Sequence, residues 1–136
     1  MGTGGRADGR EAARRHRVVA APRRGDVHLI QFEDMGGHVL RGPHPAVVVS
    51  TDRLNRSDGT VLVCSMTTKA RRVADHWLPP YLVAVSQADT GLDRDGFVKC
   101  DQLFTRPAPW LGVRVGRLRP EAMSRVDASL RFVLGL

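Results

Sequence analysis

Side chains that could cleave a phosphodiester bond recur in three stretches of this 136-residue chain. Cleavage of RNA without a metal ion needs one group that removes the proton of a ribose hydroxyl and another that protonates the departing oxygen. It also needs positive charge or hydrogen-bond donors around the phosphate. The three stretches supply His38, Arg41 and His44 in a glycine-rich segment, Thr67, Thr68 and Lys69 after a valine-rich run, and Lys99 and Asp101 in FVKCDQLFT.

Spacing gives further information about two of these groups. Lys99 and Asp101 are two residues apart, so in a strand both side chains would face the same side of a sheet. Paired charges on a strand are more often a solvated face than an active site, so this spacing alone does not define a site. Arg71 and Arg72 follow Lys69 in a basic segment and suit sequence-tolerant contacts with phosphates.

Other kinds of chemistry lack their motifs in this sequence. There is no HExxH, no CxxC and no cluster of acidic ligands, so we expect no metal ion. Neither a phosphate-cradling P-loop nor a Rossmann fingerprint is present, which argues against a nucleotide cofactor. Cys64 and Cys100 lie in apolar runs, and we expect both to be small core residues.

Short apolar runs separated by glycine and proline predict the elements that hold these residues. The cluster 55–59 predicts a turn, and Pro120 predicts the first turn of a helix that ends before Gly135. The apolar stripe of this helix consists of Met123, Val126, Leu130, Val133 and Leu134. Strands are predicted at 27–32, 46–50, 61–66, 81–85, 97–105 and 113–118. The pattern predicts a mainly β fold, a small barrel or strongly curved antiparallel sheet with a C-terminal helix.

The positive charge of the chain is concentrated at its beginning. The whole sequence has 21 basic and 14 acidic residues, a net charge of +7, and residues 1–24 alone hold seven arginines and two acids, a net +5. We expect residues 1–22 to be a disordered basic tail and 23–136 to be one folded domain. The alternative is a basic arm that attracts nucleic acid. The first 17 residues lack a hydrophobic signal region, and no apolar run could cross a bilayer, so we expect a cytoplasmic protein.

Taken together, the order of motifs resembles the MazF/PemK/Kid family. These motifs are RRGDVHLIQF, HPAVVVSTDRLNR, a valine-rich run ending in MTTK, GLDRDGFVKCDQLFT and VDASLRFVLGL, and they extend from about Arg23 to Leu136. The family comprises toxins of type II toxin–antitoxin systems that act as messenger-RNA endoribonucleases. The resemblance implies an SH3-like barrel, a homodimer, and metal-independent cleavage of single-stranded RNA at short sequences. It also implies 2′,3′-cyclic phosphate and 5′-hydroxyl ends, and an antitoxin partner, which we expect to be acidic.

Site residues are carried over only where the motifs match. His38 and Asp101 would transfer protons, Lys99 would replace an arginine of the family, and Thr67 would donate a hydrogen bond to the phosphate. The family's arginine before proline is His44 here, and Arg41 can supply the missing charge. The RNA-binding set is Arg24, Arg41, Thr68, Lys69, Arg71, Arg72 and Gln102.

Two alternatives remain open at this stage. A non-catalytic toxin that poisons gyrase would share the fold, and fold alone does not assign chemistry. The KCDQ and MTTK motifs favour a nuclease, because a poison does not need them. A plain RNA-binding barrel is disfavoured by the small number of aromatic residues, and we expect Trp77 and Trp110 to serve packing first.

Overall fold

The computed structural model describes residues 21–32, 37, 42–68 and 78–136. The six strands are β1 (Asp26–Phe32), β2 (Gly42–Val48), β3 (Thr60–Thr67), β4 (Leu82–Val85), β5 (Gly96–Pro107) and β6 (Arg114–Arg117). The helices are α2 (Asp52–Ser57), α3 (Gln87–Thr90), the 3-10 turn η1 (Ala108–Trp110) and α4 (Pro120–Leu134). None of the helices in these described ranges is long and apolar enough to cross a membrane.

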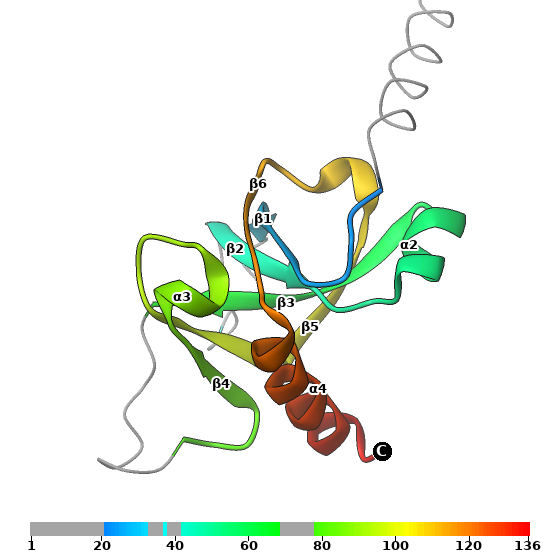
Figure 1. Ribbon diagram of the computed structural model, residues 1–136. Coiled ribbons are helices and arrows are strands. Elements are labelled where there is room, and N and C mark those ends of the chain that lie inside the picture. Colours follow the sequence, from blue (N-terminus) through cyan, green and yellow to red (C-terminus); the bar gives the residue numbers. More distant parts are fainter. Residues whose placement is uncertain (1–20, 33–36, 38–41, 69–77) are drawn as a thin grey trace, which may run out of the picture.

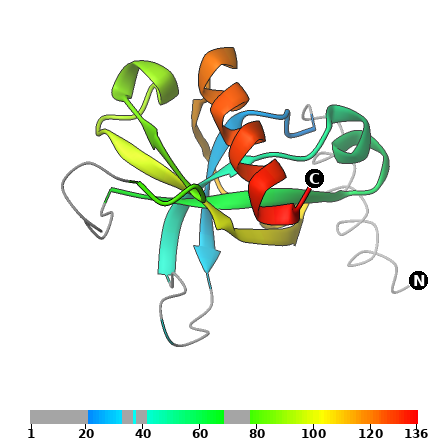
Figure 2. The same ribbon diagram turned by 90° about the horizontal axis from the view of Figure 1, so that it is seen from below.

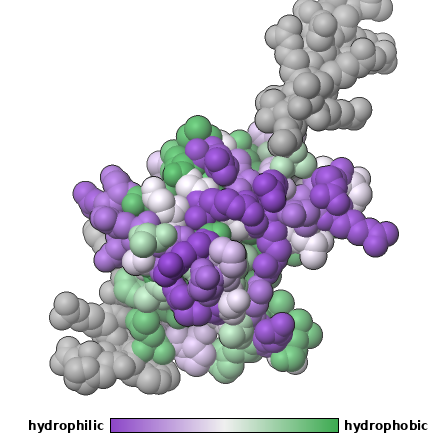
Figure 3. All heavy atoms as spheres, viewed as in Figure 1, coloured by the Kyte–Doolittle hydropathy of each residue, from purple (hydrophilic) through white to green (hydrophobic). Residues whose placement is uncertain are grey.

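All six strands form one antiparallel sheet in the order β4-β5-β3-β2-β1-β6. The sheet curls into a half-barrel, and α4 lies across one of its faces (Figures 1 and 2). The predicted fold class, mainly β with a C-terminal helix, is therefore confirmed. Figure 3 shows hydrophilic side chains over β6 and the start of α4, where Arg117 and Arg119 form ion pairs with buried Asp26 and Asp89.

Successive side chains along each strand point to opposite faces of the sheet, so the hydrophobic core is divided into two clusters. On the face toward α4, which we call the α4 face, Val47, Cys64, Met66, Val98 and Cys100 pack against Ala122, Met123 and Val126. On the opposite side, the far face, a second cluster comprises Ile30, Phe32, Ala46, Val48, Val61 and Val63. The prediction that Cys64 and Cys100 are core residues is confirmed, because both are fully buried.

The predicted C-terminal helix is confirmed at both ends. Pro120 stands in its first turn, and Gly135 caps it with a φ of 71° in the left-handed region. The predicted apolar stripe is wrong at one position, because Leu134 is 52% exposed. The stripe ends with Val133, which packs against the α4-face core, because the helix runs past the edge of the sheet.

Two short helices were not predicted from the sequence. The predicted turn at 55–59 is largely occupied by α2, whose N-terminus is capped by the Thr51 hydroxyl accepting from Leu54 N. Asn55 is buried and donates through Nδ2 to Ser50 O at 3.1 Å, which fixes the helix to the end of β2. The other helix, α3, begins with a capping box between Ser86 and Asp89.

Strand β2 begins four residues earlier than predicted. Pro43 and Pro45 pair with β1, whereas the pairing with β3 begins only at Ala46. Two prolines two residues apart place both missing N–H groups on the same edge of a strand. The prolines therefore fit where β2 pairs on one side only.

Candidate active site

Three of the expected catalytic side chains share the far face of the sheet. Lys99 pairs directly with Ser65 across β5 and β3, and residues opposite one another in a sheet project to the same face. Thr67 lies two residues beyond Ser65 and therefore faces the same way. His44 lies two residues before Ala46, the partner of Ser65, and therefore projects to the same face.

Asp101 lies in a bulge of β5. Ser65 pairs with Lys99, but its neighbour Cys64 pairs with Leu103, so residues 100–102 have no partner on β3. Asp101 is exposed at this bulge, and Gln102 is buried and accepts a hydrogen bond from Ser65 Oγ at 3.2 Å. The regular alternation of side chains between the two faces therefore stops at Cys100, and the bulge exposes the Asp101 carboxylate to solvent, two residues from Lys99 in the chain.

A cation and three rings form a cluster on the far face that the sequence analysis missed. The ring centroids of Phe32 and Phe104 are 4.9 Å apart, and those of Phe32 and His44 are 6.5 Å apart. The Arg106 guanidinium lies 5.0 Å from the Phe104 centroid and 5.7 Å from that of Phe32. The available signal was the spacing of Phe104 and Arg106, two apart on a predicted strand and so on one face.

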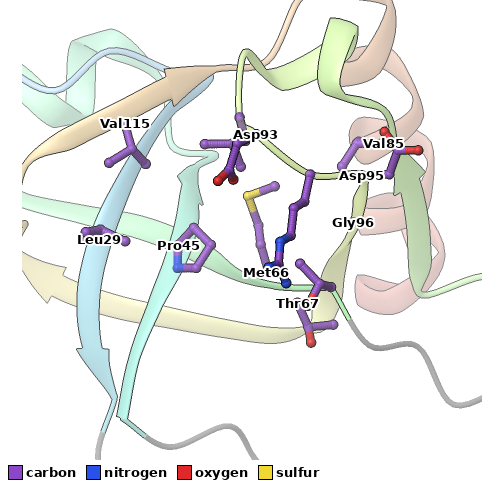
Figure 4. A pocket seen from close by; sticks show the side chains of 12 residues that line it. Leu29, Pro45, Met66, Thr67, Val85, Asp93, Asp95, Gly96 and Val115 are labelled. Atoms are coloured by element: carbon purple, nitrogen blue, oxygen red, sulfur yellow. The ribbon is translucent and has the colours of Figure 1, made fainter.

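A cavity of about 310 Å³ lies beside the end of β3 (Figure 4). Thr67 and Thr68 line one wall, and Leu29, Pro45 and Met66 contribute apolar surface. Asp93, from the segment between α3 and β5, directs its carboxylate into this space. Met66 and Val85 belong to the α4-face core, so the cavity opens on that side of the sheet, opposite His44 and Lys99, and Thr68, an expected RNA-binding residue, lies on its wall.

Backbone packing fixes the position of Thr67. A Cβ atom at Gly96 would lie 2.8 Å from Thr67 O and 3.9 Å from Thr68 Cα, so only glycine allows β5 to begin this close to the end of β3. The two threonines are therefore positioned by a contact that tolerates no side chain.

Arg24 lies apart from the far-face residues. Its Nε donates to Val49 O at 3.0 Å, and its guanidinium forms an ion pair with Asp127 of α4. Its backbone N–H donates to the Asp52 carboxylate at 2.7 Å. Arg24 thus ties the start of the domain to α2 and α4. The other expected residues, His38, Arg41, Lys69, Arg71 and Arg72, lie outside the described residues, as does Trp77.

Cys64 and Cys100 are both buried in the α4-face core. A hydrogen bond with Cys100 and burial raise the pKa of Cys64 above the ordinary value of a thiol, so this cysteine is a neutral core group. Within residues 21–32, 37, 42–68 and 78–136, no three histidine, cysteine or acidic side chains are grouped as metal ligands.

The curled antiparallel sheet and the C-terminal helix define a small β-barrel fold class, and comparison with known proteins identifies the family. Residues 23–134 match the model of the PemK-like, MazF-like toxins of type II toxin–antitoxin systems, and the chain belongs to this family. The expected family resemblance is therefore confirmed.

Solved structures agree with this assignment. An endoribonuclease of a mycobacterial species, in complex with its cognate antitoxin, is 30% identical with a TM-score of 0.68, over 85% of this chain and 97% of that chain. Another mycobacterial endoribonuclease is 27% identical with a TM-score of 0.68, over 85% and 93% of the two chains. MazF of Deinococcus radiodurans, at 21% identity, shares the fold with a TM-score of 0.69, over 85% and 98%.

Proposed function

We propose that this toxin is a metal-independent endoribonuclease that cleaves single-stranded messenger RNA at short sequences in the cytoplasm. The observation that carries the proposal is the convergence of His44, Thr67 and Lys99 on the far face, with Asp101 exposed in the adjacent bulge. This arrangement offers a carboxylate for proton transfer beside groups that bind a phosphate.

The proposed reaction is an internal transfer within the RNA. The 2′-oxygen attacks the adjacent phosphorus, the bond from phosphorus to the 5′-oxygen breaks, and the products carry a 2′,3′-cyclic phosphate and a 5′-hydroxyl. His38 and Asp101 take the proton from the 2′-hydroxyl and return one to the 5′-oxygen. Lys99, His44 and Arg41 stabilise the charge on the phosphate, and Thr67 donates a hydrogen bond to it.

The direct test is incubation of the purified toxin, free of antitoxin, with several RNA sequences in EDTA. We expect cleavage, with a cyclic phosphate detected by mass spectrometry of the upstream fragment. RNA that stays intact across all sequences would contradict the proposal. Inhibition of gyrase by the same preparation would then favour the non-catalytic alternative.

An acidic antitoxin and a second copy of the chain are the proposed protein partners. The mycobacterial relative is recorded with its cognate antitoxin, and MazF of D. radiodurans is recorded with MazE. The last turn of α4 exposes Phe132 and Leu134, and Leu136 just beyond the helix is also exposed, which gives an apolar surface suited to self-association. Sedimentation of the toxin alone and with antitoxin measures both associations.

We expect deletion of residues 1–22 to leave RNA cleavage within about twofold of the full chain at physiological salt. The reason is that five of the seven net positive charges lie in residues 1–24, whereas the proposed site lies in the domain. Comparison of cleavage rates of the full and shortened proteins tests this. A loss of activity only at higher salt would instead assign the segment to RNA binding.

We expect Gly96→Ala to lower RNA cleavage at least about 10-fold, because its new Cβ would displace Thr67 and Thr68. Single-turnover cleavage rates measure the effect. Gly116→Ala is the matched control, since its Cβ would lie 2.5 Å from Thr90 O and 3.2 Å from Leu92, and would not press on Thr67 or Thr68. A similar fall in the rate per folded molecule for both variants would show that Gly96 does not position the site.

A further inference from the structure

Arg106 differs from the other well-anchored arginines in how its charge is held. Five arginines in the described part of the chain form ion pairs with buried or half-buried aspartates, namely Arg24, Arg114, Arg117, Arg119 and Arg125. Arg106 forms no such pair within the described ranges. Among the described residues its guanidinium donates from Nη1 to the carbonyl oxygen of Thr105, at 2.8 Å.

Two aromatic rings hold this guanidinium in place of a carboxylate. Cζ of Arg106 lies over Phe104 at 5.0 Å and over Phe32 at 5.7 Å, and the two rings contact one another. Phe32 is 2% exposed, so the platform under the guanidinium is part of the far-face core. Ring contacts orient the guanidinium but use none of its N–H donors, and an arginine has five.

The charge of Arg106 lies at the proposed site. The Phe32 ring contacts the Arg106 guanidinium and its centroid lies 6.5 Å from that of His44, so both side chains belong to one cluster. Lys99 and Gln102 lie on the same strand and face as Phe104, toward the bulge. An RNA strand that is bound at His44 would therefore have Arg106 within the same cluster of side chains.

We propose that Arg106, supported by Phe32 and Phe104, is a binding site for a phosphodiester of the RNA strand that flanks the cleaved bond. A guanidinium fork binds two phosphate oxygens at once, and an arginine already fixed on rings loses little rotational freedom on binding. The site contacts the backbone and not a base, so it strengthens binding equally for all sequences. This inference rests on the proposed function, because RNA must lie across the far face.

The test measures RNA binding separately from cleavage. The probe is a fluorescent 2′-O-methyl oligoribonucleotide, which cannot be cleaved, and its Kd is measured by anisotropy over a range of KCl concentrations. We expect Arg106→Gln to raise the Kd about 10-fold and to reduce the slope of log Kd against log salt by about 0.7, the value for one phosphate contact on a single strand. The loss should be the same for several sequences.

Two further variants make the result specific. Arg131→Gln removes the same charge from an exposed position on α4, across the sheet, and should leave Kd and slope unchanged. Arg106→Met keeps an apolar side chain over the rings and should bind RNA as weakly as Arg106→Gln, which separates charge from ring packing. Circular dichroism confirms that each variant is folded.

Several outcomes would overturn the inference. Unchanged Kd and slope in folded Arg106→Gln and Arg106→Met would exclude the phosphate contact. An equal change in Arg131→Gln would show a general charge effect. Weaker binding of an acidic antitoxin peptide, with RNA binding unchanged, would assign Arg106 to a protein carboxylate. A toxin that binds RNA with this Arg106 dependence but does not cleave would contradict the proposed function and leave the binding site intact.

Discussion

Asp101→Asn should lower RNA cleavage at least about 100-fold, because asparagine keeps the size of the side chain but cannot take up a proton. The bulge at residues 100–102 should persist, since Gln102 and its bond with Ser65 are unchanged. The rate of cleavage under single-turnover conditions in EDTA measures the effect. RNA binding should change far less than the rate, which separates proton transfer from affinity.

The matched control for this result is Asp95→Asn. Asp95 lies just before β5, and its Oδ1 accepts from Gln87 N at 2.9 Å, a bond that an asparagine oxygen can also accept. Cleavage by this variant should stay within about twofold of the wild-type rate. Equal losses of activity in both variants would show that the effect comes from the loss of any negative charge and not from Asp101 in particular. An Asp101→Asn variant that still cleaves RNA would show that Asp101 does not transfer a proton.

The second large effect concerns stability. Asp89→Ala should lower the free energy of unfolding by about 2 kcal/mol, the cost of a buried carboxylate whose partners are half-exposed arginines. The Asp89 carboxylate accepts from Arg119 Nε at 2.6 Å, from Arg125 Nη2 at 3.0 Å and from Ser86 N at 2.9 Å. It therefore joins α3 to α4. Urea unfolding measures the change, with Glu121→Ala, which is exposed and 3.9 Å from Arg119, as a nearly neutral control.

This stabilisation should depend on pH in a defined direction. Hydrogen bonds from Ser86 N and from Arg119 lower the pKa of Asp89 from 3.8 to about 2. A carboxylate with a lowered pKa in the folded state stabilises the fold fully above the unfolded value and loses that contribution as pH falls through the folded value. The difference in unfolding free energy between wild type and Asp89→Ala should therefore narrow between about pH 4 and pH 2. A constant difference over that interval would contradict the role assigned to Asp89.

Strands and the closing helix could be predicted from sequence because their apolar runs are long enough to fix the hydrophobic period. The short helices α2 and α3 could not, since each has at most six residues and depends on caps rather than on an apolar stripe. The start of β2 at Gly42 was hidden by Pro43 and Pro45, whose fit depends on which neighbouring strand is present.

The candidate site also depends on contacts between distant parts of the chain that the sequence does not reveal. The residue types of Thr67, Lys99 and Asp101 indicate the chemistry, whereas the bulge that exposes Asp101 is a matter of register between distant strands. Arg106 was missed because its importance arises from Phe32, which is 74 positions earlier in the chain and meets it only in the folded sheet. Both the exposure of Asp101 and the ring contacts of Arg106 are determined by long-range strand pairing and not by local sequence preferences.

The bulge in β5 also makes activity depend on the folding of both hydrophobic clusters of the domain. Before the bulge, Val98 and Cys100 pack in the α4-face core, and after it Phe104 packs against the far-face core. Asp101 therefore stands at the junction of two hydrophobic clusters that must both form before Lys99 and Gln102 take up their register. A nascent chain in which only one cluster has formed has no aligned site, so we expect RNA cleavage to appear only when the whole domain has folded.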